Sequence, residues 1–209
     1  YLLETGYGDE LSSYVNLEKD GNLSFNLVSF YTNQLVPYGA GGTSSIRIGV
    51  NADASRSYSI AIGNSASATT ASGNIAIGKS AQATGSSYCA IAIGDTAVAS
   101  TECSVAIGYS ADATTGLYNV AIGRHAQATG SSGSLALGND AQASIRNGIS
   151  VGSGTRTTGN ESLAIGCNAK AGYDGSSAIG VDATTEYANQ MVLGKSTTAV
   201  NPKGVVRIG

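Results

Sequence analysis

The chain has 209 residues, a formal net charge of −3, and only 12% charged residues. It has no basic cluster, which argues against nucleic-acid binding, because that function needs a stripe of Lys and Arg. No stretch approaches 18 consecutive apolar residues, so the sequence predicts no transmembrane helix. The chain opens at Tyr1 without Met or a charged and apolar leader, so we expect a processed or trimmed fragment.

Residues 1–43 form the first predicted domain, because they lack the repeat that fills the rest of the chain. Two short apolar runs, from Tyr14 to Leu17 and from Leu23 to Leu27, flank Asp20-Gly21 and predict a β-hairpin. So short a segment offers few residues for a core of its own. We therefore expect a hairpin that caps the next domain. A dedicated module for docking to a larger assembly is the alternative.

Residues 44–209 form the second predicted domain, in which one phrase, apolar-small-apolar-Gly, recurs every 14 to 16 residues. A regular period of this size is typical of stacked copies of one supersecondary unit, and predicts a β-solenoid of about 11–12 coils. Each glycine predicts a tight bend with positive φ or a close backbone approach. The glycines are Gly49, Gly63, Gly78, Gly94, Gly108, Gly123, Gly138, Gly152, Gly166, Gly180, Gly194 and Gly209.

A second phrase follows each glycine, with small residues three and five places further on and a mostly polar residue between them. This period of two predicts a short strand whose small side chains face inward and whose polar side chain faces water. Arg156 and Lys170 are among the polar residues, and their burial without partners would be costly. Two short strands per coil favour a flattened, two-sided roll.

The first phrase alternates in the opposite sense, with aliphatic residues on either side of a residue that is nearly always Ala. We expect the aliphatic pair to face the inside of the coil. The uniformly small middle residue indicates that another surface approaches closely, so we interpret it as the interface of a homotrimer. A roll this thin is expected to be unstable as a monomer. The expected interface residues are Ala61, Ala76, Ala92, Ala106, Ala121, Ala136, Ser150, Ala164 and Ala178.

Arginine replaces the middle alanine in the first and last coils, at Arg47 and Arg207, and Val192 replaces it in the penultimate coil. An arginine does not fit a tight alanine ladder. Three explanations stay open: the subunits splay there, the arginine meets acidic groups of an adjoining domain, or its charge prevents end-to-end aggregation of exposed strands.

Five tyrosines occupy the variable segments, five to seven residues before their glycines, and are expected to form a column along one edge of the roll. Tyrosine rings suit contacts with sugar faces and with proteins. They are therefore candidate residues for binding a host glycan or protein, with shielding of the edge or packing between subunits as the alternative. They are Tyr58, Tyr88, Tyr118, Tyr173 and Tyr187.

The sequence does not support catalysis, so we expect a protein that is not an enzyme and has no cofactor and no metal. His125 is the single histidine and is expected in an exposed bend, which leaves no material for a catalytic triad or a His-rich metal site. Cys89 and Cys103 each lie five residues before a glycine and should stack in neighbouring coils. A disulfide between them is conceivable, but we expect these cysteines and Cys167 to serve as small apolar residues.

The strings AIGKSAQATG (residues 76–85), SVAIGYSADATTG (104–116) and NVAIGRHAQATGSSGSLALGNDAQA (119–143) resemble the head repeats of YadA-like trimeric autotransporter adhesins. Similar repeats occur in bacteriophage tail fibres and other host-attachment proteins. The resemblance covers about residues 44–209. It implies a left-handed parallel β-roll and three chains side by side around a common axis, without a cofactor.

Our leading expectation is a non-enzymatic trimeric fibre that attaches to a host-cell glycan or protein. It would act outside cells, as a phage tail-fibre component on the virion, joined to other virion or surface fibre proteins. We favour the phage because no coiled-coil stalk follows the repeats and a non-repeat segment precedes them. The alternatives are the head of a bacterial trimeric adhesin that binds matrix or cells from the bacterial outer surface, and a purely structural spacer of a fibre.

Overall fold

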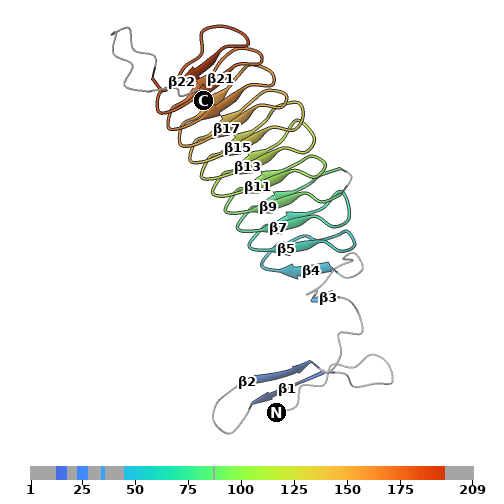
Figure 1. Cartoon of the computed structure of the whole chain (residues 1–209). Helices are drawn as coiled ribbons and strands as arrows, with labels where there is room; N and C mark the ends of the chain where they lie inside the picture. The colour runs from blue at the N-terminus through green and yellow to red at the C-terminus, as the bar shows by residue number, and fades with distance from the viewer. Residues whose placement is uncertain (1–12, 18–22, 28–33, 36–44, 87, 196–209) are drawn as a thin grey trace, which may run out of the picture.

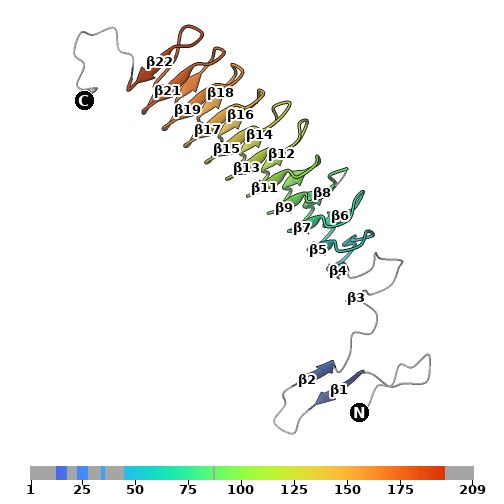
Figure 2. The same ribbon diagram turned by 45° about the vertical axis from the view of Figure 1, so that its right-hand side comes forward.

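The computed structural model describes residues 13–17, 23–27, 34–35, 45–86 and 88–195, and describes side chains in the last two ranges. These residues contain strands and turns but no helix, and from residue 45 onward they wind into a straight solenoid of about ten turns (Figures 1 and 2). The predicted all-β parallel solenoid is therefore confirmed. The repeat that ends at Gly209 lies outside the described residues.

Within the described residues the roll has two parallel sheets, and every turn between residues 60 and 171 contributes one strand to each. The first sheet has twelve strands: β3 (Gln34–Leu35), β4 (Ser45–Ile48), β5 (Ile60–Ile62), β7 (Ile75–Ile77), β9 (Ile91–Ile93), β11 (Val105–Ile107), β13 (Val120–Ile122), β15 (Leu135–Leu137), β17 (Ile149–Val151), β19 (Leu163–Ile165), β21 (Ser177–Ile179) and β22 (Met191–Leu193). The second has eight: β6 (Ser67–Ala68), β8 (Gln82–Ala83), β10 (Val98–Ala99), β12 (Asp112–Ala113), β14 (Gln127–Ala128), β16 (Gln142–Ala143), β18 (Arg156–Thr157) and β20 (Lys170–Ala171).

The strands of neighbouring coils pair in register, so equivalent residues stack directly on one another. Ala106 in β11, for example, pairs with Ala92 in β9 and with Ala121 in β13. The described coils of the roll pair into two sheets, which confirms the flattened, two-sided cross-section. Because the register is exact from coil to coil, each position of the repeat becomes a column that runs the length of the roll.

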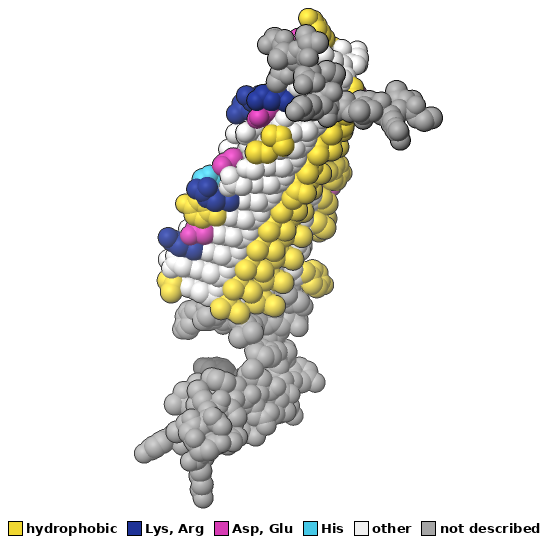
Figure 3. All heavy atoms as spheres, turned by 60° about the vertical axis from the view of Figure 1, so that its left-hand side comes forward, with side chains coloured by type: hydrophobic (Ala, Val, Ile, Leu, Met, Phe, Trp, Pro, Cys, Tyr) yellow, Lys and Arg dark blue, Asp and Glu magenta, His cyan; other side chains and the backbone are white. Residues whose placement is uncertain are grey.

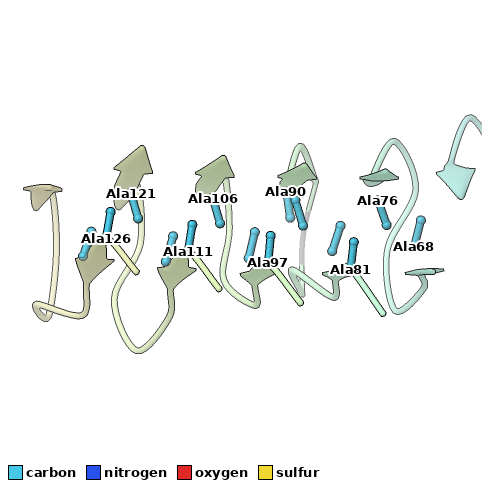
Figure 4. Close-up of a cluster of buried hydrophobic side chains, with 14 of the residues drawn as sticks. Ala68, Ala76, Ala81, Ala90, Ala97, Ala106, Ala111, Ala121 and Ala126 are labelled. Carbon is cyan, nitrogen blue, oxygen red and sulfur yellow. The ribbon is translucent and has the colours of Figure 1, made fainter. Parts of the chain in front are cut away.

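The interior between the sheets is built almost entirely of alanine. The small residues of the second phrase, such as Ala111 and Ala113, are fully buried, as predicted. Opposite them lie the middle residues of the first phrase, such as Ala106 and Ala121, which are equally buried, and Figure 4 shows the two sets pointing toward each other between the ribbons. The core is therefore one pair of methyl groups thick.

This arrangement corrects the predicted subunit interface. The middle residues of the first phrase are completely enclosed by their own chain, so they are not available to contact another subunit. All nine have a relative exposure of 0%: Ala61, Ala76, Ala92, Ala106, Ala121, Ala136, Ser150, Ala164 and Ala178. Uniform smallness here reflects the close approach of the chain's own second sheet, and the aliphatic residues that flank them face outward.

A column of small polar residues closes the interior beside the alanines. Asn119, one place before β13, is fully buried, and its amide nitrogen donates hydrogen bonds to the carbonyl oxygens of Thr114 (3.0 Å) and Gly130 (2.8 Å). Its side-chain oxygen accepts a hydrogen bond from the backbone N–H of Ser134 (2.9 Å). Asn74, which lies three repeats earlier in the polar column, makes the equivalent three contacts. Buried amides that satisfy loop backbone groups stabilise the bend in which each coil returns to the first sheet.

The repeated glycines begin the turn between the first strand and the second. From Gly49 to Gly180 their φ angles lie between 123° and 137°, and a Cβ at any of them would collide with backbone atoms of the equivalent glycine in the next coil. The backbone N–H of Gly108 also donates to the Ile93 carbonyl oxygen at 2.8 Å. Both predicted reasons for glycine are therefore confirmed, unusual φ and close backbone approach.

Two further positions per coil adopt left-handed conformations without glycine. One lies two residues after the glycine, where the non-glycine φ angles fall between 51° and 57° from Asn51 to Asp182. The other lies five residues before the next glycine, at Tyr58, Cys103 and Tyr118 among others. The N–H groups of both columns donate to the preceding coil, as from Ser110 to Asp95 (2.9 Å), so the turns are stacked by hydrogen bonds as the strands are.

The N-terminal segment contains the predicted antiparallel strand pair. β1 (Ser13–Leu17) pairs with β2 (Leu23–Leu27), with Val15 opposite Phe25, and the turn between them lies outside the described residues. β3 pairs in parallel with β4, so the first sheet of the roll begins before residue 44. The roles of residues 1–43 in capping or docking stay predictions.

We expect Gly108→Ala to destabilise the roll by about 3 kcal/mol or more, because an alanine must adopt a φ of 135° and its Cβ collides with the Gly123 carbonyl group. Gly73→Ala is the control: its φ of 76° costs about 1 kcal/mol, and a Cβ there has no atom within 4 Å. Urea unfolding at one fixed protein concentration measures both. Equal losses in the two variants would contradict the stacking argument.

We expect Ala121→Leu to destabilise the fold itself by about 3 kcal/mol or more, because the alanine is fully enclosed between the two sheets. Ala188→Leu, at an exposed position, should change the free energy of unfolding by less than about 0.5 kcal/mol. Urea unfolding and circular dichroism measure the effect. An Ala121→Leu protein of unchanged stability that merely fails to assemble would restore the alanines as a subunit interface.

Candidate interaction surfaces

The aliphatic residues of the first phrase form a continuous stripe on the outer face of the first sheet. Each strand of the first sheet from β5 to β19 presents two aliphatic side chains outward on either side of its buried middle residue, for example Ile91 and Ile93 around Ala92. Most are half-buried by their neighbours in the stripe, while Ile48, Leu137, Ile149 and Ile165 are 37–47% exposed. Figure 3 shows the stripe as an unbroken yellow band along the roll.

This aliphatic stripe is larger than isolated apolar residues on a soluble surface. At about 4.8 Å per coil it runs for roughly 50 Å and is two side chains wide. Apolar patches beyond a few hundred Å² mark interaction sites on soluble proteins. Its flat, regular surface has the form of a sheet face that packs against an equal face, and its chemistry suits association through the hydrophobic effect.

The five candidate tyrosines lie in the segments that connect the second sheet to the first, at the edge of the roll that we call the tyrosine edge. All are exposed: Tyr58 by 67%, Tyr88 by 62%, Tyr118 by 53%, Tyr173 by 47% and Tyr187 by 68%. The structure thus brings them to one edge, as the sequence predicts, and does not bury them within the chain. Their role in binding stays a prediction.

Charged and polar residues lie between Tyr118 and Tyr173 along this edge. Arg146 pairs with Glu161 of the next coil at 2.8 Å, with both side chains more than half exposed. Asp174 accepts a hydrogen bond from the backbone N–H of Asn160 at 2.7 Å. Such exposed contacts contribute little to stability. They give the edge alternating aromatic and polar side chains, a combination that suits sugar hydroxyls and ring faces.

The opposite edge, which we call the glycine-turn edge, carries the residues that immediately follow the repeated glycines. His125 is not freely exposed there: its ring lies 5.3 Å from the Tyr109 ring between centroids, and its Nδ1 lies 3.2 Å from Asp140 Oδ1. These residues come from three consecutive coils. Figure 3 also shows charged side chains gathered in a column at an edge of the roll, apart from the aliphatic stripe.

The outer face of the second sheet is polar. The middle residues of the second phrase point outward as predicted, and Gln82, Gln127, Arg156 and Lys170 are exposed. Val98 is the aliphatic exception in this column. The two outer faces therefore differ sharply, because one is an aliphatic band and the other is a water-compatible surface.

The described terminal coils interrupt the alanine column in different ways. Arg47 replaces the alanine in β4, its side chain is only 12% exposed, and it forms an ion pair with Asp53 at 3.2 Å. The first arginine thus pairs with an acid of its own chain. Val192 in β22 packs partly buried against the last buried alanines. Arg207 lies outside the described residues.

The prediction of free thiols rather than a disulfide is confirmed, and none of the three cysteines is fully buried. Cys89 and Cys167 are exposed and Cys103 is half-buried, and all three are free thiols. They lie in turns, where the interior does not extend. Among the described residues, His, Cys, Asp and Glu form no group of three that could hold a metal ion. No helix suited to crossing a membrane occurs among the described residues either.

Sequence reasoning missed the aliphatic stripe because it assigned the larger side chains to the interior. One signal pointed the other way. The residue before each aliphatic pair, Asn74 or Asn119 for example, has the same strand parity as the alanine and therefore faces the same side. A polar amide at that place fits a thin interior bounded by loop backbones better than an apolar subunit interface.

A family model described as the YadA head domain repeat matches residues 40–66, 90–111, 115–141, 131–155 and 158–183. The matched segments cover more than half of the chain. Between the first two, residues 67–89 continue the same strands and stacked glycines. No curated protein matches the chain significantly. The repeated coil, its in-register stacking and these matches together establish that the chain belongs to the family of YadA head domain repeats.

Proposed function

We propose that three copies of this chain assemble through the aliphatic stripe into a non-enzymatic fibre that attaches to a host-cell surface. YadA-like heads are extracellular, adhesin-like and generally homotrimeric. The observation that carries the proposal is the continuous stripe, whose side chains leave the single chain with an apolar face along its whole described roll.

The stripe supports self-association because of its regularity. A partner with the same 14- to 16-residue coil presents the same flat ladder at the same spacing, so that each side chain finds an equivalent neighbour. Burial of these half-exposed aliphatic groups would supply the stability that an interior of alanines lacks, since alanine buries little apolar area. Association around a threefold axis would leave the polar second sheet in water.

Attachment would use the tyrosine edge, which presents aromatic rings in three copies around the fibre. A repeated, weak contact for a host glycan or protein gains affinity when several copies bind at once. The exposed rings of Tyr88, Tyr118 and Tyr173 lie on different coils and offer contacts spread along the fibre.

We propose a bacteriophage tail fibre as the setting, with the head of a bacterial trimeric adhesin as the alternative. Both use the same coil and the same assembly, and they differ in what carries the fibre. An antibody against the roll, imaged by electron microscopy, should label the tails of phage particles. Label on the bacterial outer surface instead would favour the bacterial adhesin.

To test assembly, we expect Ile107→Glu combined with Ile122→Glu to raise the trimer dissociation constant by about a thousandfold or more, because association would bury unpaired charges. Sedimentation equilibrium measures the change. Gln82→Glu combined with Gln127→Glu adds the same charge to the exposed face of the second sheet and should leave the trimer intact. Three-chain assembly that survives the isoleucine changes would overturn the proposal.

To test attachment, we expect Tyr88→Ala, Tyr118→Ala and Tyr173→Ala together to lower the affinity of the trimer for host cells about tenfold or more. Tyr109→Ala removes a ring of similar exposure (52%) from the glycine-turn edge and should leave attachment unchanged. Binding to cells is measured with labelled protein. Equal binding by all the variants would favour the spacer, in which removal of two coils shortens the fibre and preserves attachment.

A further inference from the structure

Two of the three cysteines occupy the same place in neighbouring coils. Cys89 lies five residues before Gly94 and Cys103 lies five residues before Gly108. Both have left-handed backbones, with φ angles of 67° and 49°. The backbone N–H of Cys103 donates a hydrogen bond to the carbonyl oxygen of Tyr88 at 3.1 Å. The two residues are therefore stacked one above the other in the column of turns at the tyrosine edge.

This stacking meets the distance requirement for a disulfide. Neighbouring coils lie about 4.8 Å apart in the hydrogen-bonding direction, and disulfides join residues whose Cα atoms are about 4.4–6.8 Å apart. The equal backbone conformation points both side chains the same way. Cys89 is exposed and Cys103 half-buried, so a small oxidant reaches the pair from solvent.

Stacking of the coils does not itself require cysteine at this place. The equivalent residue is Tyr58, Gly73 or Tyr118 in other coils, and their backbones are equally left-handed. Cys167 provides an internal comparison. It directly follows Gly166 on the glycine-turn edge, where Ser153 and Val181 occupy the equivalent places in the neighbouring coils, so it has no stacked thiol.

We propose that Cys89 and Cys103 are a redox-active pair whose oxidation forms a disulfide staple between adjacent coils. The oxidant is a low-molecular-weight disulfide, such as oxidised glutathione. The staple joins the two coils at the end of the longest interval between repeated glycines, 16 residues from Gly78 to Gly94. It therefore fixes the chain immediately after Tyr88.

The reaction proceeds in two exchange steps. The thiolate of Cys89, the more exposed of the two, attacks one sulfur of the small disulfide and releases one small thiol. Cys103 then loses its proton to water and attacks Sγ of Cys89, which releases the second small thiol. In total, two protein thiols are oxidised to one disulfide and one small disulfide is reduced to two thiols.

The surroundings of Cys103 lower the fraction of its thiolate near neutral pH. Partial removal from water, the neighbouring Cys89 thiol and the negative charge of Glu102 raise the pKa of Cys103. Because only the thiolate attacks, closure should accelerate as the pH rises toward that raised pKa.

The test uses the assembled full chain, reduced and then exposed to oxidised glutathione. We expect each chain to become lighter by two hydrogen atoms and its three thiols to fall to one, by intact mass and thiol titration. Peptide mapping should join Cys89 to Cys103 within one chain. Cys167→Ser should close the same bond, whereas Cys89→Ser and Cys103→Ser should each retain glutathione at the remaining thiol of the pair.

Two outcomes would overturn the inference. One is stable glutathione on both Cys89 and Cys103 of the unaltered chain, which would mean that the thiols do not reach each other. The other is a bond between chains, visible as a larger species on a non-reducing denaturing gel. Amide exchange gives an independent readout: the Cys103 N–H should exchange at least several-fold more slowly in the oxidised protein than in the reduced protein, and an unchanged rate would contradict the staple.

Discussion

The rest of this structure depends on how closely its two sheets approach. Facing columns of alanine leave room between the sheets for methyl groups and little else. A side chain as large as isoleucine does not fit that space, so the aliphatic residues of the first sheet must point outward. A thin interior thus creates an apolar exterior in the same step. The apolar face through which we propose association therefore follows from the internal packing.

The same thinness makes the backbone the main source of order along the roll. Strands pair in register, and the turns at both edges donate hydrogen bonds from one coil to the next. The glycine column adds a steric condition, because each glycine lies against the backbone of the glycine above it. The buried side chains are small, but nearly every position in a coil has an equivalent neighbour, so stability is distributed among nearest-neighbour contacts along the solenoid.

Sequence periodicity was sufficient to predict the parallel solenoid, the two strands per coil and the outward polar face at residues such as Gln82 and Lys170. The periodicity also predicted that the tyrosines lie on one edge and that Cys89 and Cys103 stack in neighbouring coils. It did not decide which face of Ile-Ala-Ile is internal, because alternation alone is symmetric with respect to inside and outside. Uniform alanine indicates close approach, but not whether the approaching surface belongs to the same chain or to another.

The left-handed turn residues were missed for a related reason. Serine, asparagine and aspartate dominate the place two residues after each glycine, and asparagine and aspartate tolerate positive φ better than most residues. Their polarity gave them an ordinary explanation as exposed turn residues, so the backbone requirement was hidden. His125 illustrates the point: its position is imposed by the turn, and only the stacking of three coils brings it to Tyr109 and Asp140.

Sequence variation is distributed unevenly over the coil and separates the proposed assembly surface from the proposed attachment surface. The interior and the aliphatic stripe admit few residue types, because each side chain must match its neighbours in the adjacent coils. Outside the glycine column, the edges carry fewer such conditions on side chains, and at the tyrosine edge tyrosine, cysteine, arginine and glycine replace one another from coil to coil. A chain built this way can change what it contacts at an edge without altering how it folds. Chemistry that distinguishes one coil from the next, including the stacked thiols, is therefore expected at the edges.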